Sequence, residues 1–316
     1  MHNFGTMAAR ATRSASRKAR VTEAVATGPL GALSHDELGV ILDGLADPLQ
    51  PVVAVALSST CLGLRTPLLA ALEVLQQRHE KAKALCRKAG THCAWLHEAS
   101  HVDWNHKGLT VDHMASLGMI LRTNGLPRMQ VLNLGNNFFG DAGMQSIFTA
   151  LGRGMVPLLY RLDFYNNQFG PAGAEAVASS LRRGAMPKLS CLNLLMNPIG
   201  SQGLTALAPE LGKLPALKHL ILTDCEVGDE GVASLYTSLG KDDFKELVTV
   251  HLEENLLKDN SCAGLVSALD AGAFPNLQDA YVNHNLASLA AQQAVVQAVA
   301  RSAARHGTAA ARRTDG

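Results

Sequence analysis

L-Y-R-L-D-F-Y-N-N at residues 159–167 and L-S-C-L-N-L-L-M-N at residues 189–197 are two copies of one pattern, with apolar residues first, fourth and sixth and asparagine ninth. Further copies close with Asn137, Cys225, Asn255 and Asn285, and a degenerate first copy closes with Lys107. The closing positions are 30 residues apart except for one interval of 28. Such a fixed period is the signature of a repeat protein, in which each unit stacks on the next.

Each copy continues into a predicted helix. Apolar residues recur ten and fourteen positions after the closing residue, as at Val177 and Leu181, and a spacing of four places both on one helix face. Glycines such as Gly170 and Gly173 mark the joint, and a proline such as Pro187 follows the helix. The sequence therefore predicts an α/β solenoid of seven strand–helix units over residues 99–305, with a parallel sheet inside and helices outside.

Over these residues the chain resembles the helix-containing leucine-rich repeats of the ribonuclease-inhibitor type. The resemblance rests on seven in-phase copies with Asn, Gly and Pro at matching offsets. It implies a curved array whose concave strand face binds a protein partner.

The residues that face this concavity follow from the alternation of side chains along a strand. They form a mosaic of acids, histidines and aromatic residues with an apolar centre, as is common in protein-binding patches. The alternative is a solvated sheet face with scattered apolar residues. The candidate partner-binding residues are Asp103, Arg161, Asp163, Tyr165, Leu195, Met196, His219, Asp224, His251, Glu253, Glu254 and Tyr281.

No enzyme site is expected on this face. Acids and histidines occur on neighbouring strands, but no Ser or Cys nucleophile accompanies them with an obvious third partner, and the sequence contains no phosphate-binding loop. We therefore expect a non-enzymatic protein without a cofactor or metal.

Residues 29–98 precede the repeats and do not follow the repeat pattern. Ser34 or Asp36 can cap a first helix, Pro48 and Pro51 interrupt it, and two further helices are expected, the last over residues 68–90. The segment resembles an F-box through Glu37-Leu38, Ile41-Leu42, Cys61 and Arg65. That resemblance implies docking to a ubiquitin-ligase adaptor, through Leu38, Ile41, Leu42 and Leu45. The alternative is an N-terminal α-helical cap that covers the apolar edge of the first repeat.

Charge is distributed unevenly along the chain. Residues 1–22 contain five basic residues and no acid, and residues 301–316 contain four basic residues and one acid, which leaves 19 basic and 26 acidic residues between them. The body therefore carries a net charge of −7, which argues against a nucleic-acid partner. We expect residues 1–28 and 306–316 to be disordered tails, with organelle targeting by residues 1–28 as an alternative.

The cysteines and the hydropathy of the chain indicate the cellular compartment in which it is expected. The six cysteines are scattered without a C-x-x-C pair or a secretory leader, and no run of 18 apolar residues occurs. These features favour reduced thiols in a cytoplasmic or nuclear monomer that does not span a membrane.

Three functions stay open. The first is a protein-interaction module, which the F-box-like segment would make the substrate receptor of a ubiquitin ligase. The second is a GTPase-activating regulator of a small GTPase, which would act through Arg161 or Asn136. The third is a structural scaffold of cytoskeletal or ciliary assemblies.

Overall fold

The computed structural model describes residues 47–52, 55–56, 62–123, 126–149, 151–237, 240 and 243–314. The chain divides into two compact units, Met1–Lys81 and Ala82–Gly316. In the first unit, Nδ1 of His79 on helix α4 (Leu62–Ala89) lies 2.7 Å from the carbonyl oxygen of Pro48. Helix α4 contains most of the helix that was expected over residues 68–90.

The second unit holds the repeats, and strands alternate with helices along it. After α5 (Cys93–Glu98), seven strand–helix pairs follow. They are β1 (His101–Asp103) and α6 (Val111–Thr123), β2 (Val131–Asn133) and α7 (Gly140–Phe148), β3 (Arg161–Asp163) and α8 (Pro171–Arg182), β4 (Cys191–Asn193) and α9 (Gly200–Gly212), β5 (His219–Ile221) and α10 (Asp229–Thr237), β6 (Thr249–His251) and α11 (Asp259–Asp270), and β7 (Asp279–Tyr281) and α12 (Leu289–Thr314).

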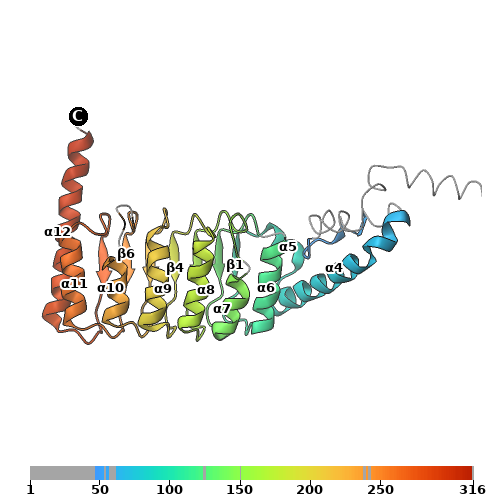
Figure 1. The fold of residues 1–316 in the computed structure, drawn as a ribbon, viewed down its shortest axis with the longest axis horizontal. Coiled ribbons are helices and arrows are strands. Elements are labelled where there is room, and N and C mark those ends of the chain that lie inside the picture. The colour runs from blue at the N-terminus through green and yellow to red at the C-terminus, as the bar shows by residue number, and fades with distance from the viewer. Residues whose placement is uncertain are drawn as a thin grey trace, which may run out of the picture. The chain divides into compact units, whose positions relative to one another are not determined.

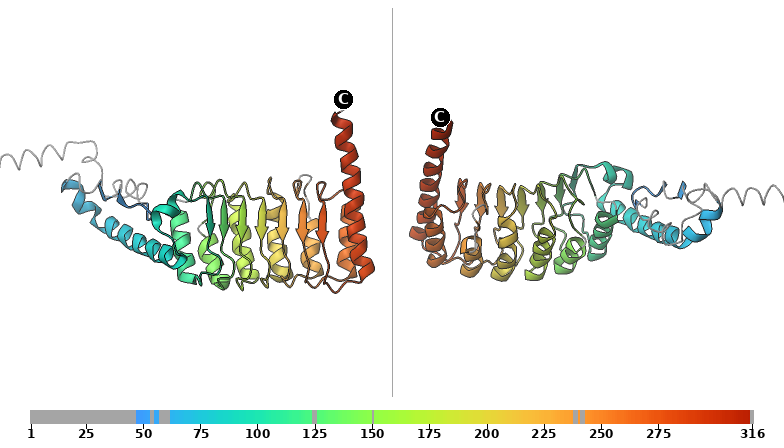
Figure 2. Two further views of the ribbon diagram at one scale, coloured as in Figure 1. Left: turned by 180° about the vertical axis from the view of Figure 1, so that it is seen from behind. Right: turned by 45° about the horizontal axis from the view of Figure 1, so that its top comes forward.

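The strands form one parallel sheet in the order β1 to β7. The central residues align across it, so that Leu162 pairs with Leu132 on one side and Leu192 on the other. The interval of 28 residues leaves this register intact, because Cys191 still pairs with His219. The helices lie on one side of the sheet (Figure 1). The opposite view shows the strands in front of the helices (Figure 2, left). The predicted α/β solenoid is confirmed.

Apolar side chains of the repeat pattern fill the space between sheet and helices. The central strand residues are all buried, from Val102 in β1 to Ala280 in β7. In the third repeat Phe164 meets Phe148 of the preceding unit edge to face, with ring centroids 5.4 Å apart. Successive repeats therefore share one continuous core.

The closing asparagines hold the turn that follows each strand. In Asn167, which is fully buried, Nδ2 donates to the carbonyl oxygens of Leu134 and Phe164, and Oδ1 accepts from the backbone N–H groups of Asn137 and Phe138. Asn197 repeats the donor half of this arrangement one unit later, through bonds to Phe164 and Leu194. These asparagines satisfy backbone groups that the turn leaves without partners.

Helix α12 packs against α11 and β7 at the C-terminal end of the array. Arg301 of α12 pairs with Asp270 at the end of α11, at 2.9 Å between Nη2 and Oδ2. Helix α12 continues to Thr314. Among the described residues, no helix has the length and apolar character needed to cross a membrane.

Candidate functional site: the strand face

The strand face is the sheet surface opposite the helices, made by alternate side chains of β1–β7 and by the residues directly after each strand. All twelve candidate residues lie in these strands or within three residues of a strand end. Parallel pairing places residues of neighbouring repeats next to one another, as with His219, Thr249 and Asp279. The face is therefore a grid in which adjacent repeats contribute adjacent side chains.

Arg161 and Asp163 pair with each other in β3. Two hydrogen bonds join them, at 2.8 Å between Nε and Oδ2 and at 3.3 Å between Nη2 and Oδ1. Asp163 is buried, and its hydrogen bond raises the pKa of Arg161. The guanidinium thus covers the carboxylate, and of the two residues only Arg161 offers a half-exposed side chain to a partner.

The centre of the face is apolar and aromatic. A Cβ built on Gly135 would lie 2.2 Å from the Tyr165 ring, so this ring packs directly over the glycine of the preceding repeat. Leu195 is half-buried, whereas Met196 is 48% exposed. Met196 has a positive φ of 58°, which turns the chain out of the strand. Met196 is therefore an apolar side chain that the fold leaves uncovered.

A histidine cluster lies on β5–β7 and consists of His219, Thr249, His251, Glu253 and Tyr281. Nδ1 of His219 lies 2.8 Å from Oγ1 of Thr249, and Nδ1 of His251 lies 3.1 Å from Oε1 of Glu253. The rings of His251 and Tyr281 stack with centroids 4.5 Å apart. The sequence predicted His219, His251, Glu253 and Tyr281 on one face, and the structure brings the last three into contact, with Thr249 as the partner of His219.

Burial lowers the pKa of His219, and the nearby His251 lowers it further. The second oxygen of Glu253 accepts a hydrogen bond from Thr223, at 2.8 Å. The cluster therefore contains two hydrogen-bonded groups, one of His219 with Thr249 and one of His251 with Glu253 and Thr223, and Tyr281 beside the second is 39% exposed.

Cys191 of β4 lies directly beside His219 of β5 in the sheet, a pairing that the sequence analysis did not identify. A thiol beside a histidine is the arrangement of a cysteine nucleophile and its base. Here, however, the thiol is buried, and burial raises the pKa of Cys191. Because the thiolate is the reactive form, this cysteine is not activated.

The turns that close the repeats carry a second polar row. In the early repeats Nδ2 of Asn136 donates to Asn105, and Nδ2 of Asn166 donates to Asn136. At the same position the fifth and sixth repeats carry Asp224 and Glu254, which are exposed and have positive φ values of 52° and 56°. This position thus carries amides in the second and third repeats and acids in the fifth and sixth.

Glu226 belongs to these acids and was missed. It lies two residues after Asp224, is exposed, and has a positive φ of 56°. Its position directly follows the closing residue of the repeat, where Phe138 and Leu256 are also exposed. That offset was the signal that could have identified it.

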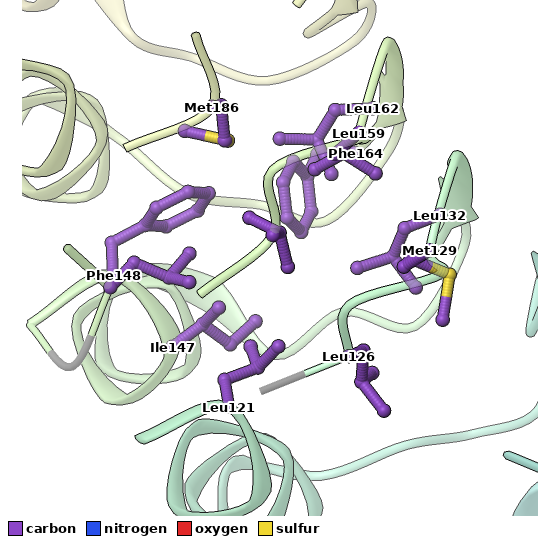
Figure 3. Close-up of a pocket in the computed structure, with 12 residues that line it drawn as sticks. Leu121, Leu126, Met129, Leu132, Ile147, Phe148, Leu159, Leu162, Phe164 and Met186 are labelled. Atoms are coloured by element: carbon purple, nitrogen blue, oxygen red, sulfur yellow. The ribbon is translucent and has the colours of Figure 1, made fainter. Parts of the chain in front are cut away.

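The pocket in Figure 3 lies in the core between the second and third repeats. Twelve side chains line it, every one of them apolar, including Phe148, Phe164 and Met186. A small-molecule site needs a few polar groups to orient its ligand, and this lining has none. We interpret the pocket as a packing gap in the core.

Within the described part of the chain, His, Cys, Asp and Glu form no group of three or more that could hold a metal ion. The residues proposed for adaptor docking, Leu38, Ile41, Leu42 and Leu45, lie outside the described residues.

Comparison with known proteins identifies the repeats. The family model described as Leucine Rich repeat matches residues 127–148, 185–208 and 213–235, which contain β2, β4 and β5 with α7 and most of α9 and α10. Among solved structures the chain is similar to Leiomodin-1 Actin-Binding Site 2 (ABS2), at 14% identity and a TM-score of 0.39, over 65% of this chain and 95% of that one. No curated protein was found to match.

Proposed function

Because the chain carries leucine-rich repeats on one continuous parallel sheet, we propose that it is a non-enzymatic protein-interaction module whose strand face binds a partner. The observation that carries this proposal is the strand face itself. Met196 is exposed on it in the fourth repeat with Leu195 and Tyr165 near it, Tyr281 is exposed in the seventh repeat, and polar residues of β5 and β6 lie between them. Aromatic and methionine side chains inside a polar rim are the usual composition of protein interfaces.

Paired substitutions in one repeat test this proposal. Met196→Asp places a charge on the strand face, and Thr205→Asp places the same charge on the exposed side of α9 in the same repeat. Each full-length variant is expressed in the native cell, and the captured proteins are quantified against the unmodified chain. We expect Met196→Asp to lose its partner and Thr205→Asp to retain it. Loss with Thr205→Asp alone would place the binding surface on the helices and refute the proposal.

The finer proposal is that this module is the substrate receptor of a ubiquitin ligase, in the cytoplasm or nucleus. Its support is the F-box-like sequence around Leu38 and Ile41. The test is recovery of the ligase adaptor by the full chain and by a variant with Leu38, Ile41, Leu42 and Leu45 changed to alanine. Loss of the adaptor in the variant supports the proposal, and equal recovery or none from either chain ends it.

The GTPase-activating alternative gains no support from its two candidate residues. Arg161 is held by Asp163 through two hydrogen bonds, and Asn136 belongs to the amide ladder with Asn105 and Asn166. Both residues therefore already have partners within the sheet and its turns. The scaffold alternative rests on no particular residue.

A further inference from the structure

Three acids at the closing turns of the fifth and sixth repeats make no side-chain bond that joins the described repeats. Asp224, Glu226 and Glu254 are exposed, and within the described residues their carboxylates make no hydrogen bond or ion pair. We call these three residues the acidic edge.

Other acids of the repeats form hydrogen bonds between neighbouring repeats. Oδ1 of Asp141 accepts hydrogen bonds from the backbone N–H groups of Gly170 and Gly173. Oδ1 of Asp229 accepts a hydrogen bond from the backbone N–H of Lys258. Each of these carboxylates therefore joins one repeat to the next. The acidic edge contributes no such bond.

At the position before the closing residue, an acid in place of Asn lowers the stability of the repeats. Asn136 and Asn166 join neighbouring repeats through their side chains, whereas two carboxylates cannot donate to each other. Asp224 and Glu254 lie in adjacent repeats whose backbones are joined by a 3.0 Å hydrogen bond from Asp224 to Glu253. Like charges at facing positions are destabilising. Among the described residues no cation pairs with either carboxylate, so both charges are available to a partner.

The surroundings of the acidic edge specify the chemistry of its partner. The segments 223–230 and 253–259 contain seven acids and one base, Lys258. Met196 is exposed in the repeat before Asp224, and Tyr281 is exposed in the repeat after Glu254. A guanidinium group pairs with carboxylates through two parallel hydrogen bonds and also stacks on aromatic rings, so arginine fits both features.

We propose that the acidic edge, with Tyr281 and Met196 beside it, is the docking site for an arginine-rich segment of a protein partner. This inference rests on the proposed function and adds the chemistry of the partner. Charge complementarity carries it, since the face is uncovered by the described residues and negative at this edge. Basic residues of the partner supply the countercharges that the fold does not.

The test uses the full-length chain and a fluorescein-labelled nona-arginine peptide, with fluorescence anisotropy at 0.15 M salt as the readout. One variant carries Asp224→Asn, Glu226→Gln and Glu254→Gln. Its matched control carries Asp112→Asn, Glu175→Gln and Glu246→Gln, which removes the same charge away from the strand face. We expect the first variant to bind the peptide about tenfold more weakly, and the control to change binding less than about twofold. Equal weakening in both, or no binding by the unmodified chain, would overturn the proposal.

The basic residues 1–22 of the chain itself are the competing occupant. A variant with Arg10, Arg13, Arg17, Lys18 and Arg20 changed to glutamine tests them in the full-length protein. Affinity for the peptide equal to that of the unmodified chain supports an external partner. An affinity about tenfold higher would show that residues 1–22 occupy the edge and would overturn the proposal of an external partner.

The two proposals fail in different ways. If Met196→Asp abolishes capture of the native partner while the acidic-edge variant retains it, the strand face binds protein and the arginine-rich chemistry is wrong. If neither variant affects capture, the strand face is not the binding surface.

Discussion

Oδ1 of Asn197 lies 2.8 Å from the backbone nitrogen of Asn167 and accepts its hydrogen bond. The same side chain donates to the carbonyl oxygen of Phe164, which belongs to the preceding repeat. One amide thus satisfies a donor and an acceptor of its neighbour at the same time. Since Asn137, Asn167 and Asn197 are all buried, the repeats are joined by a row of amides that water cannot replace.

Asn167→Ala is predicted to destabilise the protein strongly. The substitution leaves the N–H groups of Asn137 and Phe138 and the carbonyl oxygen of Leu134 without their partner. We expect the free energy of unfolding to fall by about 2–4 kcal/mol, measured by urea denaturation. Asn276→Ala is the control, because Asn276 is exposed and makes one hydrogen bond to Lys245. A loss no larger than that of the control would contradict the structural role.

Cys225 interrupts this row of amides, and Cys225→Asn is predicted to stabilise the protein. The thiol donates weakly to the carbonyl oxygens of Leu194, at 3.2 Å, and Thr223, at 3.5 Å. An asparagine adds a stronger donor and an acceptor for the preceding turn. We expect a gain of about 1 kcal/mol in the free energy of unfolding. A loss of stability would show that the shorter, 28-residue unit cannot accommodate the larger side chain.

The sequence was sufficient to predict the solenoid, for a physical reason. Each unit must bury its leucines against the next, so the pattern that forms the core also fixes which residues align. The position of Leu162 relative to Leu132 and Leu192 follows from the repeat period alone. Even the unit of 28 residues keeps the strands in register.

The side-chain interactions within the strand face could not be predicted from the sequence. The pattern places Arg161 and Asp163 on one face, but it cannot say that the guanidinium covers the carboxylate. Likewise the contact between His251 and Tyr281 depends on the rotamers of two neighbouring strands. Glu226 follows the closing residue of its repeat, so the alternation of side chains along the strand does not place it on the face. Side-chain conformation, rather than strand register, limited the prediction.

Gly135→Ala is predicted to displace Tyr165 from its position over the preceding repeat. The added Cβ would lie 2.2 Å from the ring, and since the φ of Gly135 is not positive, the effect is steric rather than conformational. We expect a loss of about 1–3 kcal/mol in the free energy of unfolding.

A double-mutant cycle with Tyr165→Ala isolates this contact. In the Tyr165→Ala background, Gly135→Ala is expected to cost less than about 0.5 kcal/mol, because the ring that it would clash with is gone. An undiminished cost in that background would assign the loss to the backbone of the turn instead of the ring.

Stability is predicted to fall on acidification through the titration of His219. Burial lowers the pKa of His219 below its ordinary value of 6.5, and the nearby His251, Lys218 and Arg161 lower it further. As the pH falls through 6.5, the unfolded chain therefore takes up a proton before the folded chain does. Proton uptake by the unfolded state favours unfolding, so the stability that this group contributes above pH 6.5 is lost as the pH falls toward its folded pKa.

The measurement is the free energy of unfolding between pH 7.5 and pH 5.5, a range in which carboxylates contribute little. His219→Gln removes the titration while keeping a group that can hydrogen bond to Thr249. We expect the variant to lose less stability than the unmodified protein over this range. Burial also lowers the pKa of His113, so His113→Gln is expected to flatten the profile independently. An NMR titration midpoint for His219 at or above 6.5 would contradict the burial of its imidazole, as would an unchanged pH profile in His219→Gln.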